Sequence, residues 1–189
     1  MSYDKTKWIY ENDPHNEIRY VLGTVGVKPL LCFGINPSTA RPGNKNLDNT
    51  CKSVQRLAIN NGFDSWIMIN IYPQRDKNPD KIHNKIDKTI HQKNLSFIDD
   101  ILSENQTNNP RIIWAAWGTL ITKRPFLIEC LIDIHTLSQK YNCTWVSIGK
   151  ESKFGHPHHP LYLKENEKIK IFGMKSYINT LKNKPAITT

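Results

Sequence analysis

The apolar residues of this chain fall into short runs that are separated by polar loops. Four runs have the length and composition of buried strands, at residues 29–33, 66–72, 111–118 and 144–149, and each ends at or just before a glycine or a proline. Nearly continuous apolar runs of this kind are typical of parallel strands that are covered on both faces. The pattern therefore predicts four central strands.

Between these runs the apolar positions recur every three to four residues, as on one face of a helix. This spacing predicts helices over residues 49–60, 124–140 and 174–181, and one or two helices over 82–103, with Asp48 as the N-cap of the first. Strands that alternate with helices indicate an α/β fold. We expect a three-layer α/β/α sandwich around a central, mainly parallel four-stranded sheet.

The N-terminal residues have a different pattern from the rest of the chain. Two aromatic and β-branched runs, at residues 8–10 and 18–22, flank a polar turn and predict a hairpin. The chain has 189 residues and no evident repeat or linker, which favours one domain. We expect its core at about residues 8–163, followed by a basic C-terminal segment at 164–189.

The composition adds a charge balance to this picture. The chain has a formal net charge of +9, and 38% of its residues are hydrophobic, enough to bury a core. A basic protein favours an anionic partner, here nucleic acid or a nucleotide. Alternatively, the positive charge reflects only a solvated surface rich in Lys and Asn. Nothing in the pattern indicates an obligate protein partner.

The cysteine spacing indicates whether the chain binds zinc, and the length of the apolar runs indicates whether it enters a membrane. Cys32, Cys51, Cys130 and Cys143 are widely spaced, without a Cys-x-x-Cys pair, so we expect reduced thiols and no zinc site. No apolar run is long enough to span a bilayer, and no signal-peptide segment begins the chain. We therefore expect a cytoplasmic protein with no membrane partner and no cofactor.

Polar residues gather where the predicted strands end. Because right-handed crossovers bring the C-terminal ends of parallel strands to one edge of a sheet, we expect the loops after the four strands to share a crevice. The expected site residues are Gly34, Ile35, Asn36, Pro37, Ser38, Thr39, Asn70, Arg75, Trp117, Gly118, His156, His159, Pro160 and Tyr162.

Three polar residues in these loops each have a functional and a structural interpretation. The Asn36 amide either orients a water or reads a base edge, or it closes an Asx turn before Pro37. Asn70 ends an apolar strand, so its amide is satisfied either by a ligand or by a structural hydrogen bond. Arg75 either contacts phosphate or forms a salt bridge with an aspartate of these loops, where Asp48 and Asp76 lie.

The loop that contains His156, His158 and His159 leaves three interpretations open. Imidazoles are common zinc ligands, but no carboxylate or cysteine stands at ligand spacing, and we expect no metal. A histidine that donates a hydrogen bond to a developing anion is the more natural chemistry beside Asn36. The third interpretation is three surface histidines, one of them capped by Tyr162.

Several short motifs follow one another along the chain in a specific order. They are Arg19-Tyr20-x-Leu22, Asn36-Pro37-Ser38-Thr39-Ala40, Asp48-x-Thr50, Asn70-Ile71 with Arg75-Asp76, Ala116-Trp117-Gly118, and Gly155-His156-Pro157-x-His159-Pro160-Leu161-Tyr162. This order resembles the bacterial and phage family called domain of unknown function 1643, over about residues 8–163. That resemblance implies no particular activity.

A more distant resemblance concerns the two loops around Asn36 and His159. Gly34-Ile35-Asn36-Pro37 is similar to the first motif of the uracil-DNA glycosylase superfamily, and His159-Pro160 is similar to its second. The resemblance implies a glycosylase-like fold in which Asn36 positions the attacking water. It also implies that His159 stabilises the oxygen of the departing base and that Asn70 reads the base edge.

These observations lead to one functional hypothesis and two alternatives. The leading hypothesis is a hydrolase that processes a base or nucleotide by cleaving an N-glycosidic bond, with Asn36 and His159 as the catalytic residues. The first alternative is a non-catalytic module that binds nucleic acid or a modified nucleotide. The second is a metal enzyme built on the histidine loop.

Overall fold

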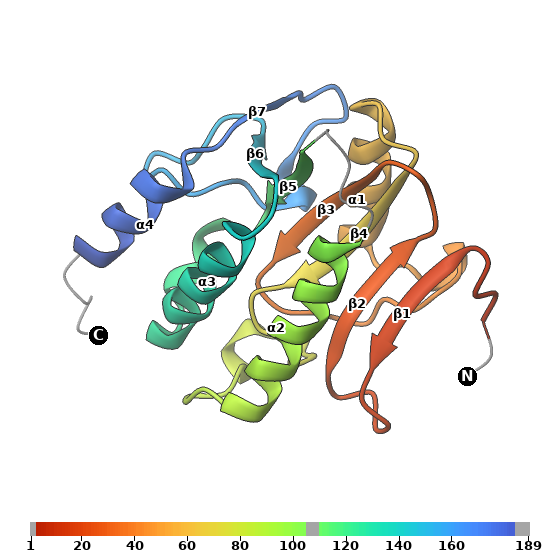
Figure 1. Cartoon of the computed structure of the whole chain (residues 1–189), viewed down its shortest axis with the longest axis horizontal. Coiled ribbons are helices and arrows are strands. Elements are labelled where there is room, and N and C mark those ends of the chain that lie inside the picture. Colours follow the sequence, from red (N-terminus) through yellow and green to blue (C-terminus); the bar gives the residue numbers. More distant parts are fainter. Residues whose placement is uncertain (1–2, 105–109, 184–189) are drawn as a thin grey trace.

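Four parallel strands form the centre of the structure, as the hydrophobic pattern predicts. The computed structural model describes residues 3–104 and 110–183. In this part of the chain, the central strands lie in the order β4, β3, β5, β6 and pair in parallel (Figure 1). Their bounds are Pro29–Gly34 for β3, Ser65–Asn70 for β4, Arg111–Ala115 for β5 and Cys143–Ile148 for β6.

Three strands extend this centre into a seven-stranded sheet, so the prediction of a four-stranded sheet is wrong. The predicted hairpin is present as β1 (Trp8–Asn12) and β2 (Arg19–Thr24), and β2 pairs antiparallel with β4. On the opposite edge, β7 (Ile169–Ile171) pairs antiparallel with β6. Sequence reasoning missed β7 because its three residues are mostly exposed and too few to set a pattern.

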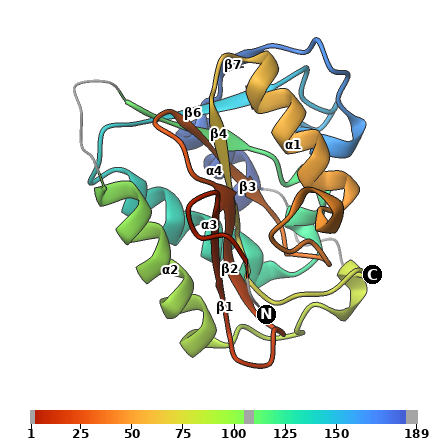
Figure 2. The same cartoon turned by 90° about the vertical axis from the view of Figure 1, so that its right-hand side faces the viewer.

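Helices cover both faces of the sheet. Helix α1 (Asn49–Asn60) lies on one face, and α2 (Lys88–Ser103) and α3 (Pro125–Ser138) lie on the other (Figure 2). Helix α4 (Met174–Asn183) packs beside α3. The α/β/α layering is therefore confirmed. Asp48 is the N-cap of α1, as predicted, and its carboxylate accepts a hydrogen bond from the backbone N–H of Cys51.

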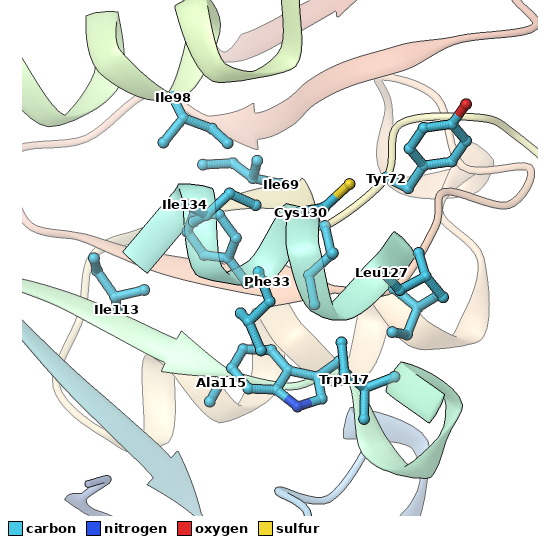
Figure 3. Close-up of a cluster of buried hydrophobic side chains, with 14 of the residues drawn as sticks. Phe33, Ile69, Tyr72, Ile98, Ile113, Ala115, Trp117, Leu127, Cys130 and Ile134 are labelled. Carbon is cyan, nitrogen blue, oxygen red and sulfur yellow. The ribbon is translucent and has the colours of Figure 1, made fainter. Parts of the chain in front are cut away.

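The two faces of the sheet carry separate hydrophobic clusters. The larger cluster joins the sheet to α2, α3 and α4; in it, Phe33 and Ile69 lie against Ile98 of α2 and Leu127, Cys130 and Ile134 of α3 (Figure 3). The smaller cluster joins the sheet to α1. Because successive strand residues face opposite sides, strands buried on both faces read as continuous apolar runs.

Polar loops follow each of the four parallel strands at one edge of the sheet, as right-handed crossovers require. Backbone hydrogen bonds continue the pairing of β3 and β4 beyond the strands themselves, from Ile71 N–H to the Gly34 carbonyl and from Tyr72 N–H to the Ile35 carbonyl. A further bond runs from Asp76 N–H to the Pro37 carbonyl. The first two loops are therefore held to each other.

No helix in the described residues is long and apolar enough to cross a membrane.

The close approach of β2 to β4 leads to a first prediction, for Gly23→Ala. A Cβ at Gly23 would lie 2.5 Å from the backbone oxygen of Trp66 and 3.0 Å from the Cα of Ile67. Backbone atoms in a paired strand cannot move aside as a side chain can, so we expect a loss of about 1–3 kcal/mol in the free energy of unfolding, measured by urea denaturation.

Gly173→Ala is the matched control. A Cβ at Gly173 meets nothing closer than 3.9 Å, so we expect a change below about 1 kcal/mol. Equal stability losses in the two variants would contradict the assigned pairing of β2 with β4.

Candidate functional site

A cavity of about 620 Å³ lies at the C-terminal ends of the parallel strands. Its walls come from the loops after β3, β4, β5 and β6 and from the first turn of α1. The volume is that of an ordinary small-molecule site. The loops that the sequence analysis expected at one crevice therefore do border one cavity.

The predicted site residues divide into two groups. Those that line the cavity are Gly34, Ile35, Asn36, Ser38, Trp117, Gly118, His159 and Tyr162. Those that do not line it are Pro37, Thr39, Asn70, Arg75, His156 and Pro160.

Asn36 is held by its amide nitrogen. Nδ2 donates to the Asp76 carbonyl at 2.9 Å and to the Pro37 carbonyl at 3.2 Å. Oδ1 has no hydrogen-bond partner in the described residues, so the Asx turn that was one alternative does not form. With both N–H groups engaged, the side chain offers a ligand one acceptor of fixed orientation.

His159 approaches the cavity from the opposite loop, at the N-cap of the short 3₁₀ helix Pro160–Tyr162. Its Nδ1 accepts the Leu161 backbone N–H at 3.4 Å, which places the proton of the neutral ring on Nε2. Burial lowers the pKa of His159, against a smaller opposing effect of the Asp48 carboxylate. The residue is therefore a neutral hydrogen-bond donor at pH 7.

Gly118 brings the loop after β5 close to His159. Its φ of +64° lies in the left-handed region, which favours glycine. A Cβ at this position would lie 3.4 Å from the Cβ of His159. The glycine thus permits the third and fourth loops to meet at the cavity wall.

His156 and the indole of Trp117 join the loops to α4. Trp117 Nε1 donates to the Tyr177 hydroxyl at 3.0 Å, and this hydroxyl lies 2.8 Å from His156 Nδ1. The Tyr177 hydroxyl links the indole of Trp117 to the imidazole of His156, and the His156 tautomer decides whether the hydroxyl or the imidazole donates in the second bond. The histidine loop is therefore anchored through α4, and the surface interpretation does not hold for His156, which is buried.

Asn70 lies buried at the end of β4, behind Gly34. Neither Oδ1 nor Nδ2 of its amide has a hydrogen-bond partner in the described residues, so the structural hydrogen bond that was one alternative is not found. Its backbone carbonyl accepts from Asn94 Nδ2 at 2.9 Å. Leaving a buried amide unsatisfied costs free energy, and Asn70 carries this cost at the end of β4.

Arg75 faces away from the cavity toward the N-terminal hairpin. Its guanidinium donates to the Tyr10 hydroxyl at 2.9 Å and to Asn16 Oδ1 at 3.0 Å. It forms no ion pair with a carboxylate in the described chain, so the predicted alternative of a salt bridge to an aspartate is wrong. Burial is the main cause that lowers the pKa of Arg75.

Several cavity residues were missed as site residues by sequence reasoning. Arg19, Asp48, Asp76 and Lys77 bring both charge signs to the wall. Asp48 and Asp76 were recognisable as charged residues in loops after strands, but Arg19 lies inside a strand and carries no such indication. Cys51 also lines the cavity, yet burial raises the pKa of its thiol to about 12, so it is no thiolate nucleophile at pH 7.

The histidine loop does not assemble metal ligands. Across residues 3–104 and 110–183, no group of three or more His, Cys, Asp or Glu side chains is arranged to hold a metal ion.

Comparison with known families identifies the chain by its central region. Residues 19–161 match the family described as protein of unknown function DUF1643. The chain belongs to this family. The match includes the loops that carry Asn36 and His159, and Arg19 is its first residue. No curated protein and no solved structure matches the chain.

The lowered pKa of His159 leads to a second prediction, on the pH dependence of stability. In the folded protein the pKa of His159 is lower than in the unfolded chain, where the residue binds a proton near its ordinary pKa of about 6.5. Stability is therefore lost as the pH falls below this value. In urea denaturation at pH 7.5 and pH 5.0, we expect His159→Asn to lose less stability on acidification than the wild type.

His15→Asn is the control, because His15 is exposed in the turn of the hairpin and its replacement should leave the pH dependence unchanged. His135, whose pKa burial also lowers, is common to all three proteins and cancels in the comparison. An identical pH dependence in His159→Asn and the wild type would show that His159 is not held neutral by the fold.

Proposed function

We propose that this protein is a hydrolase that cleaves an N-glycosidic bond in a nucleotide or in nucleic acid. One observation carries the proposal: Asn36, with a free and fixed oxygen acceptor, and His159, with a neutral ring whose proton is on Nε2, line the same cavity. The loops that bear them follow the first and the last parallel strand, so the two groups approach a ligand from different sides.

The reaction requires both kinds of group. Cleavage of an N-glycosidic bond passes through a sugar with oxocarbenium character, attacked by water while the base departs with negative charge. Asn36 Oδ1 accepts a hydrogen bond from the water and orients it toward the anomeric carbon. His159 Nε2–H donates a hydrogen bond to the departing base and stabilises its charge. The proton that the water releases as it bonds to the anomeric carbon passes through solvent to the base anion, so the products are the free base and the sugar hydroxyl.

Other groups near the cavity fit the same ligand. The Asp48 and Asp76 carboxylates line the wall and would favour the positive charge that develops on the sugar. Tyr162 is 78% exposed, with its ring 6.0 Å from that of His159, and offers a face for base stacking. The Asn70 amide is buried behind Gly34 and outside the cavity wall, so in this proposal it contacts the base edge only through a water.

The resemblance of the two loops to the uracil-DNA glycosylase superfamily supports this reaction class. It rests on the motifs Gly34-Ile35-Asn36-Pro37 and His159-Pro160 and on the α/β/α layering around parallel strands. The assignment to that superfamily is part of the proposal.

A non-catalytic nucleic-acid-binding module is the second candidate, favoured by the rim of the cavity. Leu161 and Tyr162 line the cavity and are exposed. In the same loop after β6, Phe154 is exposed as well, and Lys153 Nζ lies 5.0 Å from its ring centroid. Exposed aromatic and basic side chains of this kind suit stacking with single-stranded bases.

The third prediction concerns base release. The purified protein is incubated with single- and double-stranded DNA that contains uracil, hydroxymethyluracil or deazapurine, and with the free nucleosides and nucleotides, and chromatography detects the freed base. We expect release from at least one substrate. His159→Ala should slow it by about 10²- to 10³-fold, and Asn36→Ala by about 10²-fold through loss of water positioning.

His15→Ala is the matched control and should keep the full rate, since the exposed His15 lies in the hairpin turn outside the cavity. Circular dichroism and urea denaturation establish that each variant is folded. If folded wild-type protein releases no base from any of these substrates, the hydrolase proposal fails. Binding that weakens steeply with salt would then favour the binding module.

A further inference from the structure

Arg19 is a buried cation in the wall of the cavity. It begins β2, only 1% of its surface is exposed, and it lines the cavity together with Asp48 and Cys51. No carboxylate in the described chain forms an ion pair with it. Neither the proposed reaction nor the motifs around Asn36 and His159 account for a charge at this position.

The hydrogen-bonding groups of Arg19 are largely unused. A guanidinium has five N–H donors in a planar fork, but the partners of Arg19 are weak: Nη1 donates to the Ala40 carbonyl at a long 3.4 Å, and the side chain also bonds to the Cys51 thiol, a weak acceptor. Nε is buried and has no partner in the described residues. A buried charge without partners is costly and is retained where a ligand completes its bonding.

A second guanidinium lies beside the first. Arg75 Nη2 donates at 3.3 Å to the same Ala40 carbonyl, so one neutral oxygen is shared by two cations. The two guanidinium groups carry like charges and repel each other, and neither arginine has a carboxylate partner in the described chain. A bound anion would reduce the repulsion between the two arginines and would supply the acceptors that Arg19 lacks.

The N-terminus of α1 and two carboxylates also border the cavity. The first turn of α1 meets the cavity at Thr50 and Cys51, and the N-terminus of a helix of 12 residues presents N–H groups with partial positive charge. Asp48 and Asp76 face the cavity as well, each fixed by a backbone N–H, from Cys51 and Asn78 respectively. These carboxylates leave the Arg19 fork unoccupied.

We propose that Arg19 is an anion-binding residue that grips a phosphate group of the ligand in the cavity. Its planar fork matches two phosphate oxygens, and bidentate contacts of this kind are strong and orienting. The inference rests on the proposed function and deepens it: the substrate is a phosphate-bearing nucleoside, either a free nucleotide or a nucleotide unit within a strand. Arg19 holds the phosphate while the glycosidic bond lies between the water held by Asn36 and the His159 imidazole.

The test compares ligands that differ in their phosphate. Isothermal titration calorimetry at constant ionic strength measures binding of the common nucleosides, their 5′-monophosphates, inorganic phosphate and a short single-stranded oligonucleotide. We expect at least one monophosphate to bind the wild type about 10- to 100-fold more tightly than its nucleoside. Arg19→Met should remove this difference.

Arg56→Met is the matched control, because Arg56 is exposed on α1 and lies outside the cavity wall. It removes the same charge and should keep the preference for phosphate. A further readout is the melting temperature without ligand. Arg19→Met should melt no lower than the wild type, since methionine removes an unpaired charge and fills a similar volume. A purely structural arginine would instead lower it.

The outcomes separate this inference from the proposed hydrolysis. Phosphate-dependent binding that needs Arg19 but comes without base release supports the inference and contradicts only the proposed reaction. Tighter binding of the monophosphate than of the oligonucleotide assigns the phosphate to a free nucleotide, and the reverse assigns it to a strand. If no phosphate ligand binds the wild type more tightly than Arg19→Met, the inference is overturned, whether or not base is released.

Discussion

The site depends on the parallel pairing of β3 with β4, which continues into the loops beyond the strands. Backbone bonds from Ile71, Tyr72 and Asp76 hold the second loop to the first, and the Asn36 amide completes the connection by donating to the Asp76 carbonyl. Because this side chain is committed to holding two loops together, its oxygen points in one direction. The pairing of β3 with β4 therefore fixes the orientation in which Asn36 offers its oxygen to a ligand.

Much of the fold could be predicted from the sequence because most elements are buried on a regular period. The range 49–60 and its Asp48 cap agree with α1 to the residue, since an N-cap and a 3.6-residue period are local properties. The membership of the hairpin in the sheet could not be predicted in this way, because it depends on the contact of Gly23 with Ile67 across the chain. The strand β7 alternates as Ile169-Lys170-Ile171, but three mostly exposed residues are too few to predict a strand.

The candidate site was predictable to the extent that it consists of residues in loops after strands. Asn36, Gly118 and His159 line one cavity, as the crossover rule led us to expect. Arg75 stands in such a loop, which predicted either a phosphate contact or a salt bridge with an aspartate, yet its guanidinium bonds to the hairpin. Arg19, not Arg75, lies in the cavity wall. Because Arg19 stands inside a strand and not in a loop after one, the sequence pattern does not indicate it as a site residue.

In the proposed reaction, Asn36 and His159 lie on opposite sides of one glycosidic bond. A crystal structure of the protein with a bound nucleoside 5′-monophosphate tests this arrangement. We expect the glycosidic bond between Asn36 Oδ1 and His159 Nε2, with each of these atoms within about 3 Å of a ligand atom or of one ordered water. A nucleotide bound elsewhere, or one that leaves both side chains without a contact, would contradict the proposed roles of Asn36 and His159.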